Sequence, residues 1–447
     1  MGFNGLNLGS EWRLRALVAS SAILIALSIF IFQDVIPGKL RAATGVVCFI
    51  LIIISCSSNI RAISWRTVAW GFSLQVVLAV FILRFEVVGV RPGYELFSVL
   101  AAIVTQFLAF TNVGSEFVFG VLANQEEMGR LFPNGLVLAF SALPIIIFVS
   151  SFFTVLYHLG VLQFCVRLMA RLMMPLMRTS GAETLSAVAN VFMGQTEAPI
   201  IVKPYIPQMT QSELLTLMTG GLATIAGSVL GVYVSLGADP VAILTTSVMA
   251  APCGLYLSKI LMPETGKPAT ASTLKVSMAK NHANVIDAIA GGASDGMRLA
   301  INVAAMLIAF LAFIAMIDFL LGFIHPGMSL AQVFGFLFAP IAVLLGVPST
   351  DVPIFADMLG TKLVTNEFVA YVKLASEYNE VLSERSRTLA TFALTGFANF
   401  GSVGILLGGI GGMAPNRRPE LARLSSRALL AGFVATLINA SIAAVLI

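Results

Sequence analysis

Charged side chains are scarce in this sequence. Only 11% of its 447 residues are Asp, Glu, Lys or Arg, whereas soluble domains carry roughly 25%. Hydrophobic residues make up 58% of the chain, and apolar runs long enough to span about 30 Å of hydrocarbon recur along its length. No soluble domain of ordinary size fits between these runs. We therefore predict an all-α, polytopic protein of the cell membrane, with the lipid bilayer as its main surroundings.

Cysteine and histidine are also rare. The four cysteines lie in or beside apolar runs without a CxxC spacing, and the three histidines are dispersed. This pattern argues against a redox centre or a zinc site, and we expect no cofactor of the enzymatic kind. The net charge of +4 comes from scattered basic residues without interleaved aromatics. We therefore expect no nucleic-acid partner.

Two kinds of apolar segment alternate along the chain. Uninterrupted spans are expected near 14–33, 42–56, 67–83, 134–158, 297–323 and 425–447. Segments broken by glycine, proline or polar residues follow at 183–209, 210–235, 239–261, 335–376 and 387–413. The stretch 93–130 carries four glutamates and an arginine, so we expect it to be interfacial or only partly inserted. The pattern predicts about nine transmembrane helices plus two re-entrant helical hairpins.

The hairpins follow from the distribution of basic residues. Lys and Arg cluster at 13–15, 61–66, 167–178, 267–280 and 417–427. These clusters can all be cytoplasmic, as the positive-inside rule requires, only if two segments enter and leave the membrane on the same side. Those segments are 183–209 and 335–376, which would dip in from opposite faces. Such hairpins are tolerated where they are buried in protein or line a cavity.

A short internal repeat supports the same arrangement. The stretch "GLATIAGSV" at 221–229 resembles "GFANFGSV" at 396–403, and a polar-acidic triplet precedes each one, QTE at 195–197 and TNE at 365–367. With one gap, Gly221 aligns with Gly396 and Thr224 with Asn399. Two such units entering from opposite faces predict an inverted repeat with broken helices that meet near the membrane midplane.

Two carboxylates, Glu197 and Glu367, would lie at the hairpin tips. A carboxylate at membrane depth is costly unless it faces a partner or a cavity, and it marks a functional site by default. The alternative is pairing with Lys203 or Lys362, which lie six and five residues away. Neither offset matches the favoured i,i+3 or i,i+4 spacing on a helix. A binding cavity is therefore the better interpretation.

The side chains around these carboxylates indicate the ligand. Amides at 195, 366 and 399 donate and accept hydrogen bonds, hydroxyls stand at 196 and 402, and Phe397 offers a flat apolar face. This set suits a neutral molecule with a planar polar ring and several hydroxyls. The two negative charges invite a cation, and carbonyls freed at helix breaks are suitable ligands for one. Asn190 and Thr224, each near a break, could add side-chain oxygens.

At these residues the sequence resembles the concentrative nucleoside transporters over about residues 60–447. The matching motifs are "GQTEAP" at 194–199, "MPET" at 262–265, "TNEFVAY" at 365–371 and "GFAN" at 396–399 followed by Ser402. The resemblance implies a homotrimer, in which a scaffold surrounds a mobile transport domain built from two re-entrant hairpins and two broken helices. It also implies secondary active import of nucleosides by alternating access, coupled to a cation.

The resemblance further implies a role for each site residue. The nucleobase would be bound by Gln195, Thr196 and Glu197 and packed by Val229 and Phe397. The ribose hydroxyls would bond to Glu367, Asn399 and Ser402. A sodium ion would lie among Asn190, the Met193 carbonyl, Thr224 and the Ile225 carbonyl.

The resemblance also divides the chain into five parts. Residues 1–60 would form N-terminal transmembrane helices; 61–160, scaffold helices and an interfacial segment; 161–262, the first hairpin and broken helix of the transport domain; 263–330, a cytoplasmic connection and a scaffold helix; and 331–447, the second hairpin, broken helix and final helix.

Other interpretations stay open. Some relatives couple to protons, although the amide at 190 and the hydroxyl at 224 favour sodium here. An intramembrane enzyme with Glu197 and Glu367 as its acid–base pair would need a nucleophile or a metal. A passive channel would not need broken inverted hairpins, which indicate alternating access.

Overall fold

The computed structural model describes residues 8–124, 127–128, 130, 138–141, 143–271 and 282–447. These residues form α-helices and short 3₁₀-helices, and their one β pairing is an isolated bridge between Val87 and Val90. Eight helical segments of this described part are long and apolar enough to cross a membrane, or nine if the bent pair α7–α8 counts as one span. The all-α prediction, with about nine transmembrane helices, is confirmed.

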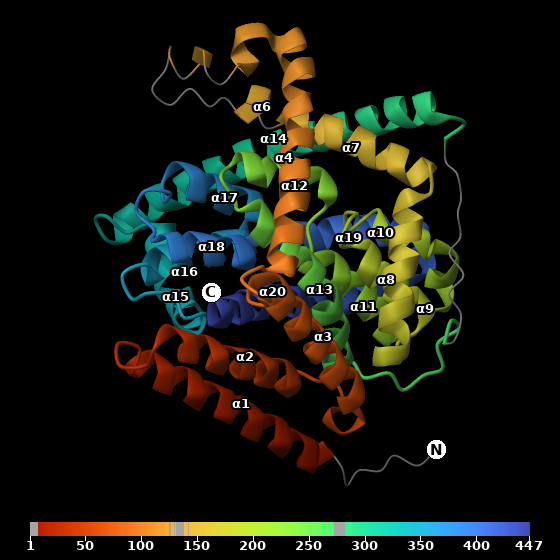
Figure 1. The fold of residues 1–447 in the computed structure, drawn as a ribbon. Helices are drawn as coiled ribbons and strands as arrows, with labels where there is room; N and C mark the ends of the chain where they lie inside the picture. The colour runs from red at the N-terminus through yellow and green to blue at the C-terminus, as the bar shows by residue number, and fades with distance from the viewer. Residues whose placement is uncertain (1–7, 125–126, 129, 131–137, 142, 272–281) are drawn as a thin grey trace.

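The chain begins with four long helices. They are α1 (Leu8–Ile31), α2 (Gly38–Ser55), α3 (Trp65–Leu83) and α4 (Pro92–Phe119). Helices α1 and α2 lie side by side at the bottom of Figure 1. The prediction of an interfacial segment at 93–130 needs correction, because α4 is continuous over 28 residues. Its acidic residues Glu95 and Glu116 stand near its two ends, so an uninterrupted apolar stretch lies between them.

The next helices border the centre of the molecule. They are α6 (Leu138–Ser141), α7 (Leu143–His158), α8 (Val161–Met177) and, later in the chain, α14 (Val285–Ile324). Residues 134–137 and 142 of the span expected at 134–158 lie outside the described residues, and α7 meets α8 at a bend of 72°. Helix α14 packs closely along α7, because a Cβ at Gly292 would lie 2.6 Å from the Cα of Ser151.

Two series of helices follow the same succession. The first series is α8, α9 (Gly181–Ala189), α10 (Ala198–Ile201), η3 (Lys203–Gln208), α11 (Gln211–Ala223), α12 (Gly227–Ser235) and α13 (Pro240–Leu261). The second is α15 (Leu330–Leu344), α16 (Val352–Val364), α17 (Glu367–Ser376), α18 (Glu384–Leu394), α19 (Phe400–Met413) and α20 (Arg418–Leu446). Each series thus contains a helix, a broken hairpin, a broken helix and a long final helix.

Two details of the predicted repeat were wrong. The second hairpin covers Val352–Ser376 and not 335–376, because α15 is a separate helix that ends before a turn at Gly346, whose φ is +74°. The paired glycines are also not equivalent. Gly221 lies inside α11, whereas Gly396 lies in the break after α18 with φ +148°. The sequence alignment of the two stretches, which rested on small residues, therefore matched the first half of one broken helix with the break of the other.

Side-chain caps fix where the halves of the hairpins and broken helices begin. Ser180 and Thr210 form capping boxes with glutamates three residues on, at the starts of α9 and α11. Asn366 and Asn399 accept hydrogen bonds from backbone N–H groups at the starts of α17 and α19. Such caps satisfy backbone donors that the first turn of a helix leaves unpaired.

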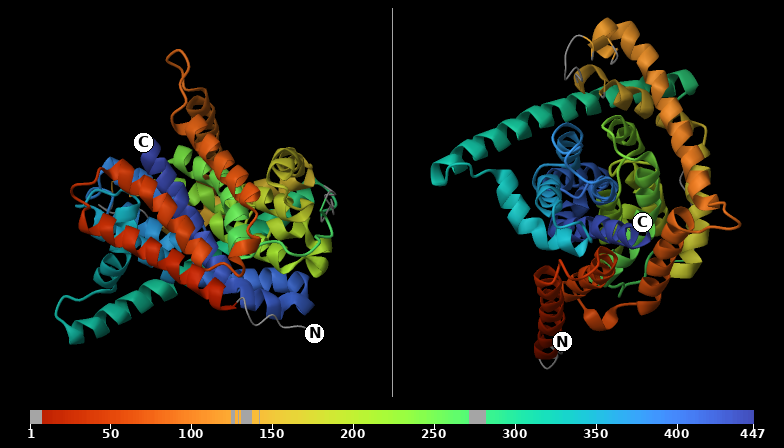
Figure 2. Two further views of the ribbon diagram at one scale, coloured as in Figure 1. Left: turned by 90° about the horizontal axis from the view of Figure 1, so that it is seen from below. Right: turned by 60° about the vertical axis from the view of Figure 1, so that its left-hand side comes forward.

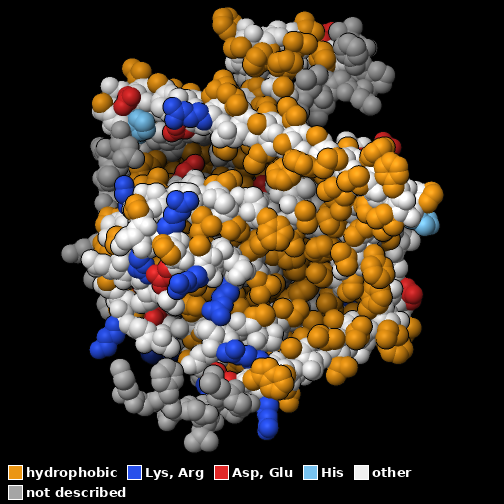
Figure 3. All heavy atoms as spheres, turned by 180° about the vertical axis from the view of Figure 1, so that it is seen from behind, with side chains coloured by type: hydrophobic (Ala, Val, Ile, Leu, Met, Phe, Trp, Pro, Cys, Tyr) orange, Lys and Arg blue, Asp and Glu red, His pale blue; other side chains and the backbone are white. Residues whose placement is uncertain are grey.

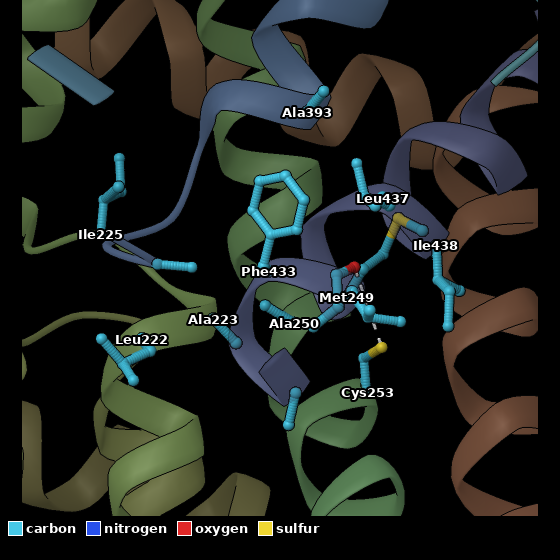
Figure 4. Packing of buried hydrophobic residues seen from close by; sticks show 14 of the residues in the cluster. Leu222, Ala223, Ile225, Met249, Ala250, Cys253, Ala393, Phe433, Leu437 and Ile438 are labelled. Atoms are coloured by element: carbon cyan, nitrogen blue, oxygen red, sulfur yellow. Dashed lines mark hydrogen bonds between the residues drawn. The ribbon is translucent and has the colours of Figure 1, made fainter. Parts of the chain in front are cut away.

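The interior is built on α11, α13 and α20. Figure 4 shows Leu222 of α11, Met249 and Cys253 of α13, and Phe433 and Leu437 of α20 packed together. In contrast, only 6% of the most apolar window of α14 is buried, against 89% for α13. In the right-hand view of Figure 2, α14 and α4 run along the outside, and the C-terminal helices lie between them.

The outer surface matches a membrane protein. Figure 3 shows a broad hydrophobic face with few charged side chains, while Lys and Arg gather at one side. Phe117 of α4 and Phe323 of α14 contribute to the exposed apolar surface of the described chain. Such a large apolar area is expected to face lipid or another copy of the chain.

Candidate functional site

The central site forms where four helices are interrupted. The interruptions lie at 190–197 between α9 and α10, at 224–226 between α11 and α12, at 365–366 between α16 and α17, and at 395–399 between α18 and α19. Backbone hydrogen bonds join them directly. Phe397 N donates to Thr224 O at 3.0 Å, and Gly227 N donates to Phe192 O at 3.3 Å. The first bond links the two broken helices.

A cavity of about 130 Å³ lies at these interruptions. It is lined by all eight side chains predicted to bind substrate: Gln195, Thr196, Glu197, Val229, Glu367, Phe397, Asn399 and Ser402. The structure therefore brings together residues that are separated by up to 207 positions. The opposite wall is apolar and comes from α14, with Leu299, Val303, Met306, Leu307 and Phe310.

One end of the cavity is organised around Glu367. This residue is 5% exposed, and its carboxylate accepts two hydrogen bonds of 2.8 Å, from Tyr233 Oη to Oε1 and from Asn399 Nδ2 to Oε2. Asn399 Oδ1 accepts from Ser402 N at 2.7 Å. The cap of α19 thus fixes the Asn399 amide, and the amide orients the carboxylate. Hydrogen bonds to charged groups are among the stronger polar interactions in proteins.

The other end of the cavity carries unused hydrogen-bonding atoms. Glu197 Oε2 accepts from Gly194 N at 3.2 Å. Gln195 Oε1 and Ser228 Oγ are buried and have no partner among the described residues. Buried polar atoms are normally satisfied, so these atoms are available to a ligand.

Neither carboxylate forms the lysine pair considered from the sequence. Within the described residues, the ion pairs of lysine involve Lys259 and Lys373. Lys203 is exposed, and Lys362 donates elsewhere. The interpretation of Glu197 and Glu367 as members of local ion pairs is therefore wrong.

A second cavity of about 150 Å³ adjoins the first, because Glu197 and Ser228 line both. Asp295 of α14, His282 and Tyr157 also line it. The second cavity is more polar than the α14 wall of the first. Hydrogen-bonding side chains therefore continue from the central cavity into the second one.

The residues predicted to bind sodium lie beside the central cavity and do not line it. Asn190 is fully buried, and its Nδ2 donates to Ser186 O at 2.9 Å while Oδ1 has no partner among the described residues. Thr224 Oγ1 donates to Gly220 O at 2.9 Å and keeps its lone pairs. Met193 and Ile225 are buried in the same two breaks. The described residues hold no group of three or more His, Cys, Asp or Glu that could bind a metal ion, so a cation here would rely on neutral oxygens.

Sequence reasoning missed two features of the site. Tyr233 lies four residues after Val229 on α12, and this helical spacing could have placed it on the same face. The apolar wall from α14 had no comparable signal, because its residues are ordinary members of a long apolar span.

Comparisons with known proteins agree with this geometry. Three family models match in chain order: the Na⁺-dependent nucleoside transporter N-terminus at 44–122, nucleoside recognition at 139–240, and the Na⁺-dependent nucleoside transporter C-terminus at 242–444. The chain is 39% identical over 466 residues to sodium/nucleoside cotransporter 1 of Mus musculus, covering 99% of this chain and 69% of that protein. It is 42% identical over 418 residues to an uncharacterized transporter of Haemophilus influenzae, covering 91% and 98%.

Solved structures give the same result. CNTnw in an inward-facing substrate-bound state matches with a TM-score of 0.86 at 40% identity, covering 92% of this chain and 98% of that one. A CNTnw variant in an outward-facing state matches with a TM-score of 0.85 at 39% identity, covering 91% and 97%. With this similarity along nearly the whole sequence and fold, the chain belongs to the concentrative, Na⁺-dependent nucleoside transporter family, a family of multi-pass membrane transporters and not of enzymes.

Proposed function

We propose that this chain imports nucleosides by sodium symport and alternating access, and that the four helix interruptions form the site where substrate and ion are coupled. The observation that carries the proposal is a cavity lined by polar side chains of both helix series. Beside it lies the buried Asn190 amide oxygen, which has no hydrogen-bond partner among the described residues. A nucleoside has a planar base at one end and sugar hydroxyls at the other. It therefore suits a cavity that is polar at both ends and apolar along one wall.

The base would lie at the first hairpin. Gln195 and Thr196 both donate and accept hydrogen bonds, and Glu197 accepts when ionised. Gln195 Oε1 has no partner among the described residues, which leaves it free to accept from an exocyclic amine or a ring N–H. Val229 and Phe397 would pack on the faces of the base.

The ribose would lie at the second hairpin. The Glu367 carboxylate is already held by two donors, so its remaining lone pairs can accept from sugar hydroxyls without a change of rotamer. Asn399 and Ser402 stand at the start of α19 and would complete the hydroxyl contacts. Preorganisation of this kind reduces the entropy that binding costs.

Sodium would be held by Asn190 Oδ1, Thr224 Oγ1 and the carbonyls of Met193 and Ile225. Among the described residues no hydrogen bond ends on either carbonyl oxygen. An ion about 8 Å from Glu197 would attract its charge by on the order of 2 kcal/mol at an effective dielectric of 20. Linkage then requires substrate to tighten sodium binding by the same factor.

We also propose the division into scaffold and transport parts. Residues 1–160 and 263–330 would form most of the scaffold, while 161–262 and 331–447 would carry the site and move against it. In this arrangement α14 stays fixed while the polar lining passes along its apolar face. A homotrimer would cover part of the apolar surface that α4 and α14 expose; cross-linking in membranes tests that assembly state.

The proposal is tested by uptake into proteoliposomes at constant pH. Labelled uridine, cytidine, adenosine and guanosine are supplied in turn, with inward sodium or with choline in its place. We expect uptake of at least one nucleoside to require sodium and to be stimulated by unlabelled nucleoside inside the vesicles. Uptake that ignores sodium and follows an imposed proton gradient would reject sodium coupling. Chemical alteration of the nucleoside, or no trans-stimulation, would reject a carrier.

A further inference from the structure

A buried lysine lies at the end of α18, where the second broken helix is interrupted. Lys362 of α16 is fully buried, and its Nζ donates to Ala393 O at 2.7 Å and to Thr436 Oγ1 at 2.9 Å. Nζ also lies 5.6 Å from the centre of the Phe433 ring. Thr436 Oγ1 donates its own proton to Phe433 O, so these partners offer Nζ only acceptors and a π face. This is the environment that an ammonium needs.

The position of this ammonium has a physical reason. Ala393 is the second-last residue of α18, so its carbonyl lacks the N–H donor that a continuing helix would provide. The C-terminal end of a helix also carries partial negative charge. Lys362 supplies both a donor and a positive charge at this interruption, and no carboxylate forms an ion pair with it in the described chain.

The first helix series has the same contact without the charge. There, α9 ends beside the end of α11, and the Asn190 amide lies so close to Gly220 that a Cβ at Gly220 would be 3.1 Å from Nδ2. In each series, therefore, the end of the first hairpin helix faces the end of the first half of the broken helix. At this place Asn190 offers an amide oxygen that is unpaired within the described part of the chain, whereas Lys362 offers an ammonium.

We propose that the Lys362 ammonium is a tethered cation, which does at the second interruption what exchangeable sodium does at the first. It neutralises the helix end and thereby positions Phe397 and Asn399, which follow within six residues. One helix end then needs a free ion and the other does not. The inference rests on the proposed sodium symport, and its consequence is that a single sodium accompanies each nucleoside.

The first test measures the stoichiometry of the wild-type protein. In proteoliposomes with the potential clamped by potassium and valinomycin, the charge moved is compared with the flux of a labelled neutral nucleoside. We expect one positive charge per nucleoside and a sodium activation curve with a Hill coefficient near one. Two charges per nucleoside would overturn the proposal, because the second cation would then be exchangeable. Uptake without any sodium dependence would instead reject the symport on which the inference rests.

The second test removes the tethered charge. Lys362→Ala leaves space where a free ion can enter, so we expect weaker transport whose sodium Hill coefficient rises from about one towards two. The matched control is Lys203→Ala, which removes an exposed lysine of the first hairpin and should leave the Hill coefficient unchanged. Transport by Lys362→Ala with a Hill coefficient still near one would overturn the proposal. If Lys362→Ala transports no nucleoside, the proposal is decided by the first test, the charge moved per nucleoside by the wild-type protein.

Discussion

Removing the Tyr233 hydroxyl should weaken the binding of the ribose part of the substrate. Tyr233 is fully buried, and its Oη donates to Glu367 Oε1 at 2.8 Å. Its ring stacks on Tyr371 with centroids 4.4 Å apart. Tyr233→Phe keeps this stacking and deletes only the hydrogen bond. Among the described residues, Asn399 is then the one side chain whose hydrogen bond still orients the carboxylate.

The size of the effect follows from the kind of bond that is lost. A hydrogen bond to a charged group contributes about 1.5–3 kcal/mol, which corresponds to roughly 10–150-fold in an equilibrium constant. We expect the dissociation constant of a ribonucleoside, measured by calorimetry in sodium, to rise within this range. Discrimination against the matching 3′-deoxynucleoside should shrink, because a loosened carboxylate loses less when the hydroxyl is absent.

A matched control separates this effect from general destabilisation. Tyr378 Oη donates to Asp357 Oδ2, also at 2.8 Å, but Tyr378 does not line the cavity. Tyr378→Phe should lower the temperature of unfolding and leave nucleoside affinity within about twofold of wild type. If Tyr233→Phe binds ribonucleosides and 3′-deoxynucleosides as the wild type does, Tyr233 does not position Glu367 and the reasoning fails.

Further predictions concern the two ends of the site and the ion. Glu367→Gln should cost about tenfold or more in nucleoside affinity, and wild-type protein should bind 3′-deoxynucleosides more weakly by about 1–3 kcal/mol; equal affinities in a competition assay would contradict the ribose assignment. Asn190→Ala and Thr224→Ala should each raise the sodium concentration for half-maximal uptake, and an unchanged value would remove that residue from the ion site. Phe397→Cys should react with a water-soluble thiol reagent and be protected by nucleoside, whereas labelling that ignores nucleoside would place it off the path. Gly396→Ala should destabilise the folded protein in a thermal unfolding assay, since a Cβ there would lie 2.6 Å from Thr436 Cγ2 at a φ that disfavours side chains.

Local patterns were sufficient for the class of fold and for most helix positions. Hydropathy along the chain predicted the membrane spans, because a helix in lipid must satisfy its backbone internally and expose apolar side chains. It failed at 93–130, where Glu95 and Glu116 stand near the ends of α4 and do not interrupt it. It also failed at 335–376, where the apolar helix α15 and the hairpin follow one another along the chain and only the turn at Gly346 separates them.

The sequence alone determined which residues had to be explained: Glu197 and Glu367 are costly in a membrane, and this cost marked them before any contact was known. Only the tertiary structure decided how that cost is met. It placed Tyr233 and Asn399 against Glu367, laid the apolar face of α14 across the cavity, and turned Lys362 away towards the end of α18. Along the chain, Glu367 lies 32 positions from Asn399 and 134 from Tyr233. Lys362 lies 31 positions from Ala393. Hydropathy and helix caps act over a few neighbouring residues, whereas such contacts depend on how whole helices pack.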